Sequence, residues 1–191
     1  MKSRLKIILA VALLCLVLCC TVVSAQDWQG LYAKKIASLG TRQDAMLIEL
    51  SGNEAPDLAL IQVDAADNAR IRLYGVNESG ATTHKVQGYD PENFGVSRFL
   101  SSGHQLRVDS KGRPCLRISL RGESEYAVLA LMGDGAGNIK KVFSACIKDG
   151  SYSVDGSKVN QARYRQLTGE FNASFRKKRG AVPAVRIPDG S

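Results

Sequence analysis

Histidine and cysteine, on which many catalytic and metal sites depend, are scarce in this chain of 191 residues. The only histidines are His84 and His104, and three of the five cysteines fall within the first 25 residues. The sequence has no Gly-x-Ser-x-Gly elbow, His-Glu-x-x-His pair, Cys-x-x-Cys pair or phosphate-binding glycine loop. These absences argue against the common hydrolases, zinc peptidases, thiol oxidoreductases and nucleotide-binding enzymes.

A clustered positive charge is also missing from most of the chain. The formal net charge is +8, but residues 26–175 hold 18 Lys/Arg against 17 Asp/Glu, which leaves +1. A nucleic-acid-binding domain needs a concentrated cationic face, so no nucleic acid is expected as a partner. The excess positive charge belongs to the two ends of the chain.

Residues 1–25 are typical of a secretory signal peptide. Lys2, Arg4 and Lys6 precede 17 uncharged residues, 7–23, and the segment ends in the small residues Ser24 and Ala25. Cleavage after Ala25 predicts a protein that is secreted or associated with the cell envelope. An uncleaved anchor is the alternative, because a span needs about 17 to 25 apolar residues.

Hydrophobic residues alternate with polar ones through most of the chain after residue 43, in short runs separated by turns rich in glycine, asparagine and aspartate. Nine or so strands of this kind predict an antiparallel β-meander, curved or propeller-like. The run "YAVLALM" is apolar on both faces, so we expect it to lie centrally or between layers. Helical spacing before the strands, after Asp27, and again around Tyr164, Leu167 and Phe171 predicts a helix at each end.

The predicted fold class is therefore α+β in a single domain, residues 26–175. Residues 176–191 have a basic run, Arg176, Lys177, Lys178 and Arg179, followed by two prolines. This composition predicts a disordered basic tail. The tail is either simply solvated or makes electrostatic contact with an anionic envelope component.

Two short motifs resemble a known group. "ELSGNEAPDL" at 49–58 is similar to the acidic loops of FG-GAP and VCBS repeats, and "YSVDGSKVNQARY" at 152–164 to a turn that opens a last helix. The layout resembles uncharacterised secreted proteins of Gram-positive bacteria. The resemblance implies a calcium loop, with these positions as candidate ligands: Glu49, Ser51, Asn53 and Asp57.

The loop departs from that pattern in charge. Only Glu49 and Asp57 match a family carboxylate, whereas Ca²⁺ prefers about six to eight oxygens, several of them charged. The alternative is a structural turn in which Gly52-Asn53 and Pro56 form the bend. No cofactor is expected beyond this weak calcium possibility.

The two cysteines outside the signal, Cys115 and Cys146, leave a disulfide open. Their strands flank a third, and strands two apart are about 9.6 Å from each other, too far for a bridge unless the sheet bends. In a regular hairpin His104 would lie across from about Ile118 or Ser119, and Cys115 across from Arg107 or Val108. This register places Cys115 and His104 too far apart to act as a catalytic dyad.

Three functions fit these observations, and the third, after the two described next, is a weakly calcium-stabilised structural module that depends on Glu49, Asn53 and Asp57. The first is an exported binding or interaction protein without catalytic activity, which uses the exposed sheet face and the basic tail to hold an anionic envelope component or another protein. In this reading the membrane is contacted only through an uncleaved signal or the tail. The second is an envelope hydrolase with an unrecognised acidic site, which a cleft gathering these residues would favour: Asp90, Glu92, His104 and Glu123.

Overall fold

A computed structural model of the chain describes residues 27–39, 42–53, 55–77, 80–177 and 184–185. They form an α+β fold of mostly antiparallel strands with two helices, which confirms the predicted fold class at this level. The predicted signal peptide and the tail residues Lys178 and Arg179 lie outside the described residues. In the described ranges, no helix has the length and apolar character needed to cross a bilayer.

The strands are divided between two sheets, whereas the sequence predicted one curved or propeller-like sheet. Sheet A has the strand order β14-β1-β2-β3-β4, and β6 also pairs with β3. Its pairings are antiparallel. Its strands are β1 (Arg42–Ile48), β2 (Asp57–Val63), β3 (Ala69–Asn77), β4 (Gly80–Thr83), β6 (Gly95–Val96) and β14 (Ala184–Val185).

Sheet B has the order β12-β11-β10-β9-β8-β7-β13. All neighbours along this order are antiparallel, and β5 adds a parallel pairing to β10. Its strands are β5 (Val86–Gln87), β7 (Phe99–Val108), β8 (Pro114–Gly122), β9 (Tyr126–Gly133), β10 (Ile139–Lys148), β11 (Ser151–Val154), β12 (Ser157–Val159) and β13 (Arg176–Lys177).

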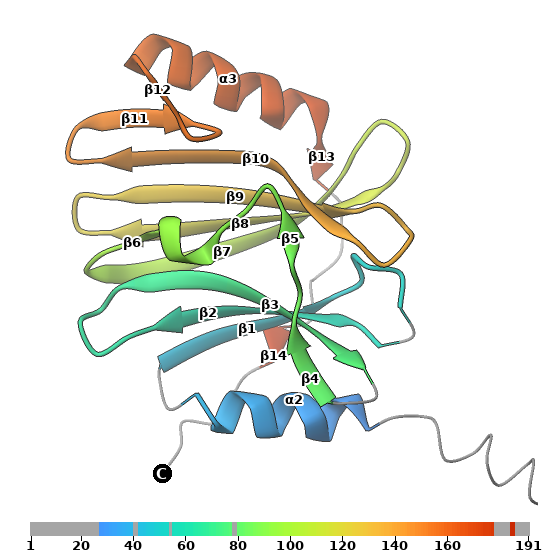
Figure 1. Cartoon of the computed structure of the whole chain (residues 1–191). Coiled ribbons are helices and arrows are strands. Elements are labelled where there is room, and N and C mark those ends of the chain that lie inside the picture. The colour runs from blue at the N-terminus through green and yellow to red at the C-terminus, as the bar shows by residue number, and fades with distance from the viewer. Residues whose placement is uncertain (1–26, 40–41, 54, 78–79, 178–183, 186–191) are drawn as a thin grey trace, which may run out of the picture.

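The two sheets pack face to face, and one helix covers the outer face of each (Figure 1). The main core lies between the sheets, where alternate apolar residues of β1, β2 and β3 meet those of β8 and β9. The largest fully buried side chains of this core include Met46, Ile61, Ile71, Leu116, Ile118, Leu129 and Leu131.

β9 lies inside sheet B, between β8 and β10, and six of its eight residues are buried. Val128 and Ala130 face the outer cluster under α3 (Gln161–Ser174), while Leu129 and Leu131 face the core between the sheets. The prediction that "YAVLALM" lies between layers is confirmed. A strand buried on both faces reads as a continuous apolar run because no position meets water.

Each helix begins at a polar cap. Asp27 accepts a hydrogen bond from the Gly30 N–H at 2.9 Å at the start of α2 (Trp28–Ala37), which packs on sheet A through Tyr32. Asn160 accepts one from the Arg163 N–H at 2.8 Å at the start of α3. Caps of this kind stabilise a helix by about 1 kcal/mol, because they satisfy N–H groups that have no partner in the first turn.

One segment crosses from sheet A to sheet B and back. After β4 the chain pairs with β10 through β5, forms the short helix η1 (Pro91–Asn93), and returns to sheet A through β6. In Figure 1 this segment runs across the gap between the two sheets. It forms one wall of a cavity against the inner face of β10.

Candidate functional site

The acidic loop between β1 and β2 is folded around the carboxylate of Asp57. Oδ2 of Asp57 accepts hydrogen bonds from the N–H groups of Leu50 at 2.9 Å and Ser51 at 2.8 Å. Oδ1 accepts one from the Ser51 hydroxyl at 2.8 Å. Asn53 N–H reaches the Ser51 hydroxyl at 3.5 Å, whereas the Glu49 side chain is exposed. The loop therefore brings Ser51 and Asp57 together and leaves Glu49 outside.

Asp57 also contacts His84, which lies just after β4. The His84 side chain is only 19% exposed, and its Nε2 lies 2.8 Å from Asp57 Oδ1. That distance suits an ion pair when the imidazole is protonated, although the direction of the ring N–H does not suit a hydrogen bond. Burial alone would raise the pKa of Asp57, but His84 and the donors of Ser51 and Leu50 outweigh it and lower this pKa.

The turn between β9 and β10 holds this loop in place. The Gly137 N–H donates to the Ser51 carbonyl at 3.0 Å. A β-carbon at Gly133 would lie 1.5 Å from the Leu50 carbonyl oxygen, so no other residue fits there without moving the loop. The contacts are those of a structural turn packed against a neighbouring hairpin.

The four candidate calcium ligands do not fit a calcium site. Both oxygens of Asp57 are occupied by protein donors, and the imidazole beside it would compete with a cation. Ca²⁺ needs several oxygens free to point at one centre. In the described ranges no group of three or more His, Cys, Asp or Glu is placed to hold a metal.

Cys115 and Cys146 are both free thiols in this structure, so the disulfide that the sequence left undecided is not formed here. Across β9, Cys115 pairs with Met132 and Cys146 with Ala127, which places them near opposite ends of that strand. Five residues along a strand span about 17 Å, well beyond disulfide reach. Cys115 is buried under α3, whereas Cys146 packs against the core between the sheets, so the two thiols lie on opposite faces of sheet B.

The predicted register of the β7–β8 hairpin is confirmed. His104 lies opposite Ile118, and Cys115 lies opposite Arg107. Ile118 faces the core between the sheets, while Cys115 faces the outer cluster. His104 and Cys115 therefore lie on opposite faces of sheet B and do not form a dyad. Burial raises the pKa of the Cys115 thiol to about 12, so it is not an activated nucleophile.

The residues proposed for a hydrolase do not share a cleft. Asp90 and Glu92 line a cavity beside β10, but His104 and Glu123 are not among its lining residues. Glu123 instead forms an exposed ion pair with Arg98 at 2.7 Å. The structure thus brings together two of the four residues.

Two arginines lie close together on the outer face of the β7–β8 hairpin. Gln105 is opposite Arg117, and Arg107 is two residues along the same strand, so Arg107 and Arg117 are diagonal neighbours. Arg107 donates to Gln105 Oε1 at 3.1 Å and to the Phe175 carbonyl at 3.0 Å. Partial burial and the charge of Arg117 lower the pKa of Arg107. Arg107 is therefore held in place by neutral groups.

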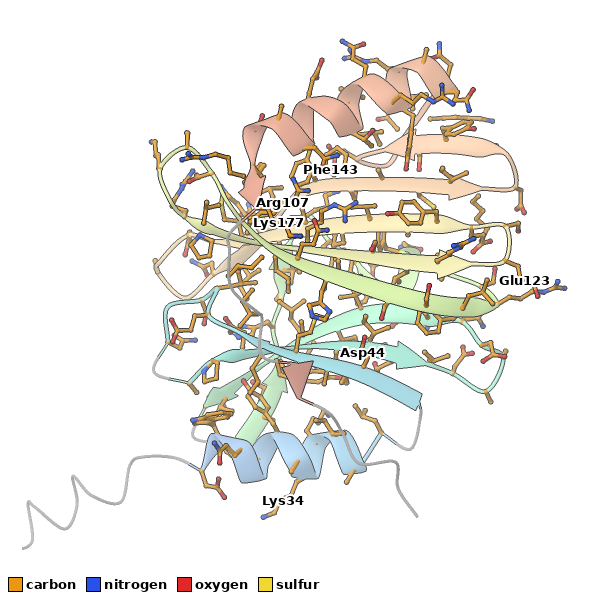
Figure 2. The ribbon with its side chains drawn as sticks, turned by 180° about the vertical axis from the view of Figure 1, so that it is seen from behind. Lys34, Asp44, Arg107, Glu123, Phe143 and Lys177 are labelled. Atoms are coloured by element: carbon orange, nitrogen blue, oxygen red, sulfur yellow. The ribbon has the colours of Figure 1, made fainter. Side chains whose placement is uncertain are left out.

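A third cation joins them from the end of the chain. β13 pairs with β7 and places Lys177 directly opposite Arg107. Figure 2 shows Arg107 and Lys177 side by side near the C-terminal end of α3. The described residues include no carboxylate within 4.0 Å of Arg107, Arg117 or Lys177. We call these three residues the cationic surface.

Within the predicted tail, Arg176–Lys177 and Ala184–Val185 form two short strands, β13 and β14. β13 pairs with the edge of sheet B, and β14 pairs with β1 at the edge of sheet A. The basic run thus begins within sheet B.

Sequence reasoning missed the cationic surface, although part of the signal was present. The predicted register sets Cys115 across from Arg107 or Val108, and Arg117 is only two residues from Cys115 in the sequence. Lys177 had no such signal, because a two-residue strand leaves no pattern in a basic run.

No family model, curated protein or solved structure matches this chain.

Proposed function

We propose that the protein is an exported binding protein without catalytic activity that holds an anionic component of the cell envelope through the cationic surface. The single observation that carries this proposal is the gathering of Arg107, Arg117 and Lys177 on one face, with no carboxylate of the described residues within 4.0 Å of them. Export itself rests on the signal sequence at residues 1–25.

Like charges placed side by side on a sheet destabilise it unless a partner neutralises them. Elsewhere in the described chain, arginines pair with acids: Arg70 and Arg72 with Glu92, and Arg113 with Asp109. The cationic surface has no such partner. An anionic ligand would supply the missing charge.

The chemistry of these side chains favours phosphate or carboxylate groups. A guanidinium offers N–H donors in a planar fork that matches both anions. One such donor, Nε of Arg117, is buried and has no acceptor in the described part of the chain. Nη2 of the same arginine donates to the Tyr126 hydroxyl at 3.5 Å, which is a weak contact.

The basic run extends this surface along the chain. Lys177 is followed in sequence by Lys178 and Arg179. A cation near a strongly anionic surface contributes up to about 1 kcal/mol, and salt weakens it. The cationic surface would orient the protein on the anionic component, and the charges of Lys178 and Arg179 would strengthen the binding.

The hydrolase alternative has less support. Asp90 accepts from the Glu92 N–H at 3.0 Å and from Asn93 Nδ2 at 2.6 Å, and Glu92 is paired with two arginines. Carboxylates engaged in this way are poorly placed to act as general acid or base.

The test is co-sedimentation of the mature protein with isolated envelopes, comparing wild type with the triple variant Arg107→Gln, Arg117→Gln and Lys177→Gln. We expect the variant to bind about tenfold to hundredfold more weakly, from a loss of up to about 1 kcal/mol per cation. Added salt should release the wild-type protein. Thermal unfolding of both proteins checks that the variant is folded.

The matched control removes three exposed cations from other parts of the molecule: Lys34, Lys85 and Lys140. Its net charge equals that of the first variant. Pelleting like wild type is expected for this control. If the two triple variants lose binding equally, general charge rather than the cationic surface carries the interaction, and the proposal fails.

A further inference from the structure

A cavity of about 550 Å³ lies between the crossing segment and the inner face of β10. Ligand sites are commonly clefts of about 300 to 1,000 Å³ lined by apolar groups and a few convergent polar ones. Two aromatic rings, Tyr89 and Phe94, form part of the wall and pack edge to face with centroids 5.8 Å apart. Cys146 and Val96 extend the apolar lining. We call this the β10 cavity.

All three carboxylates that line the cavity are already occupied by protein donors. Glu125, whose side chain is 5% exposed, accepts from the Ser97 N–H at 2.6 Å and lies 3.3 Å from Lys148 Nζ. Glu92 is paired with Arg70 at 2.6 Å, and Asp90 accepts from Asn93. The cavity therefore has little capacity left to bind a cation.

The cations that line the cavity differ in how closely each is paired with a carboxylate. Arg70 and Lys148 are held by Glu92 and Glu125, as above, whereas the one carboxylate near Lys141 among the described residues is that of Asp155, at 3.8 Å. Moreover, the same Asp155 oxygen already accepts from the Ser144 N–H at 2.8 Å and hydroxyl at 3.2 Å. Lys141 is thus the cation best able to accept a new anionic partner.

The position of Lys141 follows from an irregularity in β10. The pairing of β10 with β9 shifts register between Lys141 and Phe143. Lys141 pairs with Leu131, whose side chain faces the core between the sheets, while Phe143 faces α3. The bulge turns a lysine toward the inside of the molecule, where its side chain is only 21% exposed.

We propose that the β10 cavity binds a small organic anion, whose carboxylate, phosphate or sulfonate pairs with Lys141 and whose apolar part lies against Tyr89, Phe94 and Cys146. This site is separate from the cationic surface, because none of Arg107, Arg117 and Lys177 lines the cavity. It adds a small-molecule ligand to the proposed envelope-binding function.

The test uses anilinonaphthalene sulfonate, a fluorescent anion with an apolar ring system. Titration of the full mature chain should show one bound molecule per chain, and octanoate should displace it whereas octanol should not. Lys141→Gln should weaken binding about tenfold, the loss expected for one charge-assisted contact. Lys141→Arg, which keeps the charge, should restore most of the affinity.

Lys140→Gln is the matched control, since Lys140 is an exposed neighbour on the same strand with the same charge. It should bind the dye like wild type. Equal weakening by Lys140→Gln and Lys141→Gln, or none by either, would overturn the proposal.

A second measurement reports on the cavity directly. Bound dye should slow alkylation of Cys146 by iodoacetamide, read by mass spectrometry, because the thiol lies in the cavity wall. An unchanged rate at saturating dye would overturn the proposed location. The triple variant of the cationic surface should bind the dye normally, which separates this test from the envelope test.

Discussion

The imidazole of His84 lies against Gly75, and a β-carbon at Gly75 would be 2.1 Å from its Nε2. The glycine leaves the space that allows His84 to reach the buried carboxylate of Asp57. The side chains of β2 and of the segment after β4 thus meet across β3 only because one position on β3 has no side chain.

Gly75→Ala should therefore lower the free energy of unfolding by about 1 to 3 kcal/mol, the usual cost of overpacking. The added methyl group would displace His84 from Asp57. Urea denaturation measures the change. In a His84→Ala background the same substitution should cost much less, and equal costs in both backgrounds would contradict the proposed clash.

Asp57→Asn should cost about 3 kcal/mol, because the N–H groups of Leu50 and Ser51 would lose a charged acceptor in a buried site. The pKa of Asp57 is lowered in the folded state, so its stabilisation is present above the unfolded pKa near 4 and is lost as the pH falls through the folded value. Wild type and variant should therefore converge in stability at strongly acidic pH. A constant difference down to that range would show that the charge of Asp57 is not the cause.

Calcium should not raise the melting temperature. The oxygens of Asp57 are occupied by the donors of Leu50 and Ser51, and Glu49 points to solvent. Thermal unfolding with calcium and with a chelator should give the same curve. A rise that depends on calcium concentration would mean that the loop rearranges into the metal site that its resemblance implies.

In a chain that begins at residue 26, both cysteines, Cys115 and Cys146, should be present as thiols under oxidising conditions. Cys146 should react slowly in the native state, since burial raises its pKa, and Cys115 only after unfolding. Thiol titration in denaturant, without reductant, should count two groups per chain. A count of zero would establish a bridge and a different packing of β10.

Much of the fold was predictable from local patterns. Alternation predicted the short antiparallel strands, and the regular hairpin predicted the register that sets His104 opposite Ile118. Asp27 predicted the start of the helix that packs on sheet A. These features depend on residues close together in sequence.

The division into two sheets was not predictable in this way. Alternation states which residues share a face, but it does not state which strand that face meets. The approach of His84 to Asp57 and of Lys177 to Arg107 also depends on contacts between distant parts of the chain. The β10 cavity was not predictable either, because it depends on a shift in the pairing of β10 with β9 just after Lys141. In the sequence that position is seen only as the second of two adjacent lysines.

The parallel pairing of β5 with β10 also affects the order in which the molecule assembles. Val86 pairs with Ile139, which is synthesised 53 residues later, so β5 has no partner until the β9–β10 hairpin exists. Closing so long a loop for a strand of two residues gains few hydrogen bonds, which makes this pairing a late step in folding. By the same reasoning it should open before the rest of the sandwich, and amide hydrogen exchange should be faster at Gln87 than in β9. Such local opening would give a ligand a way into the β10 cavity without global unfolding.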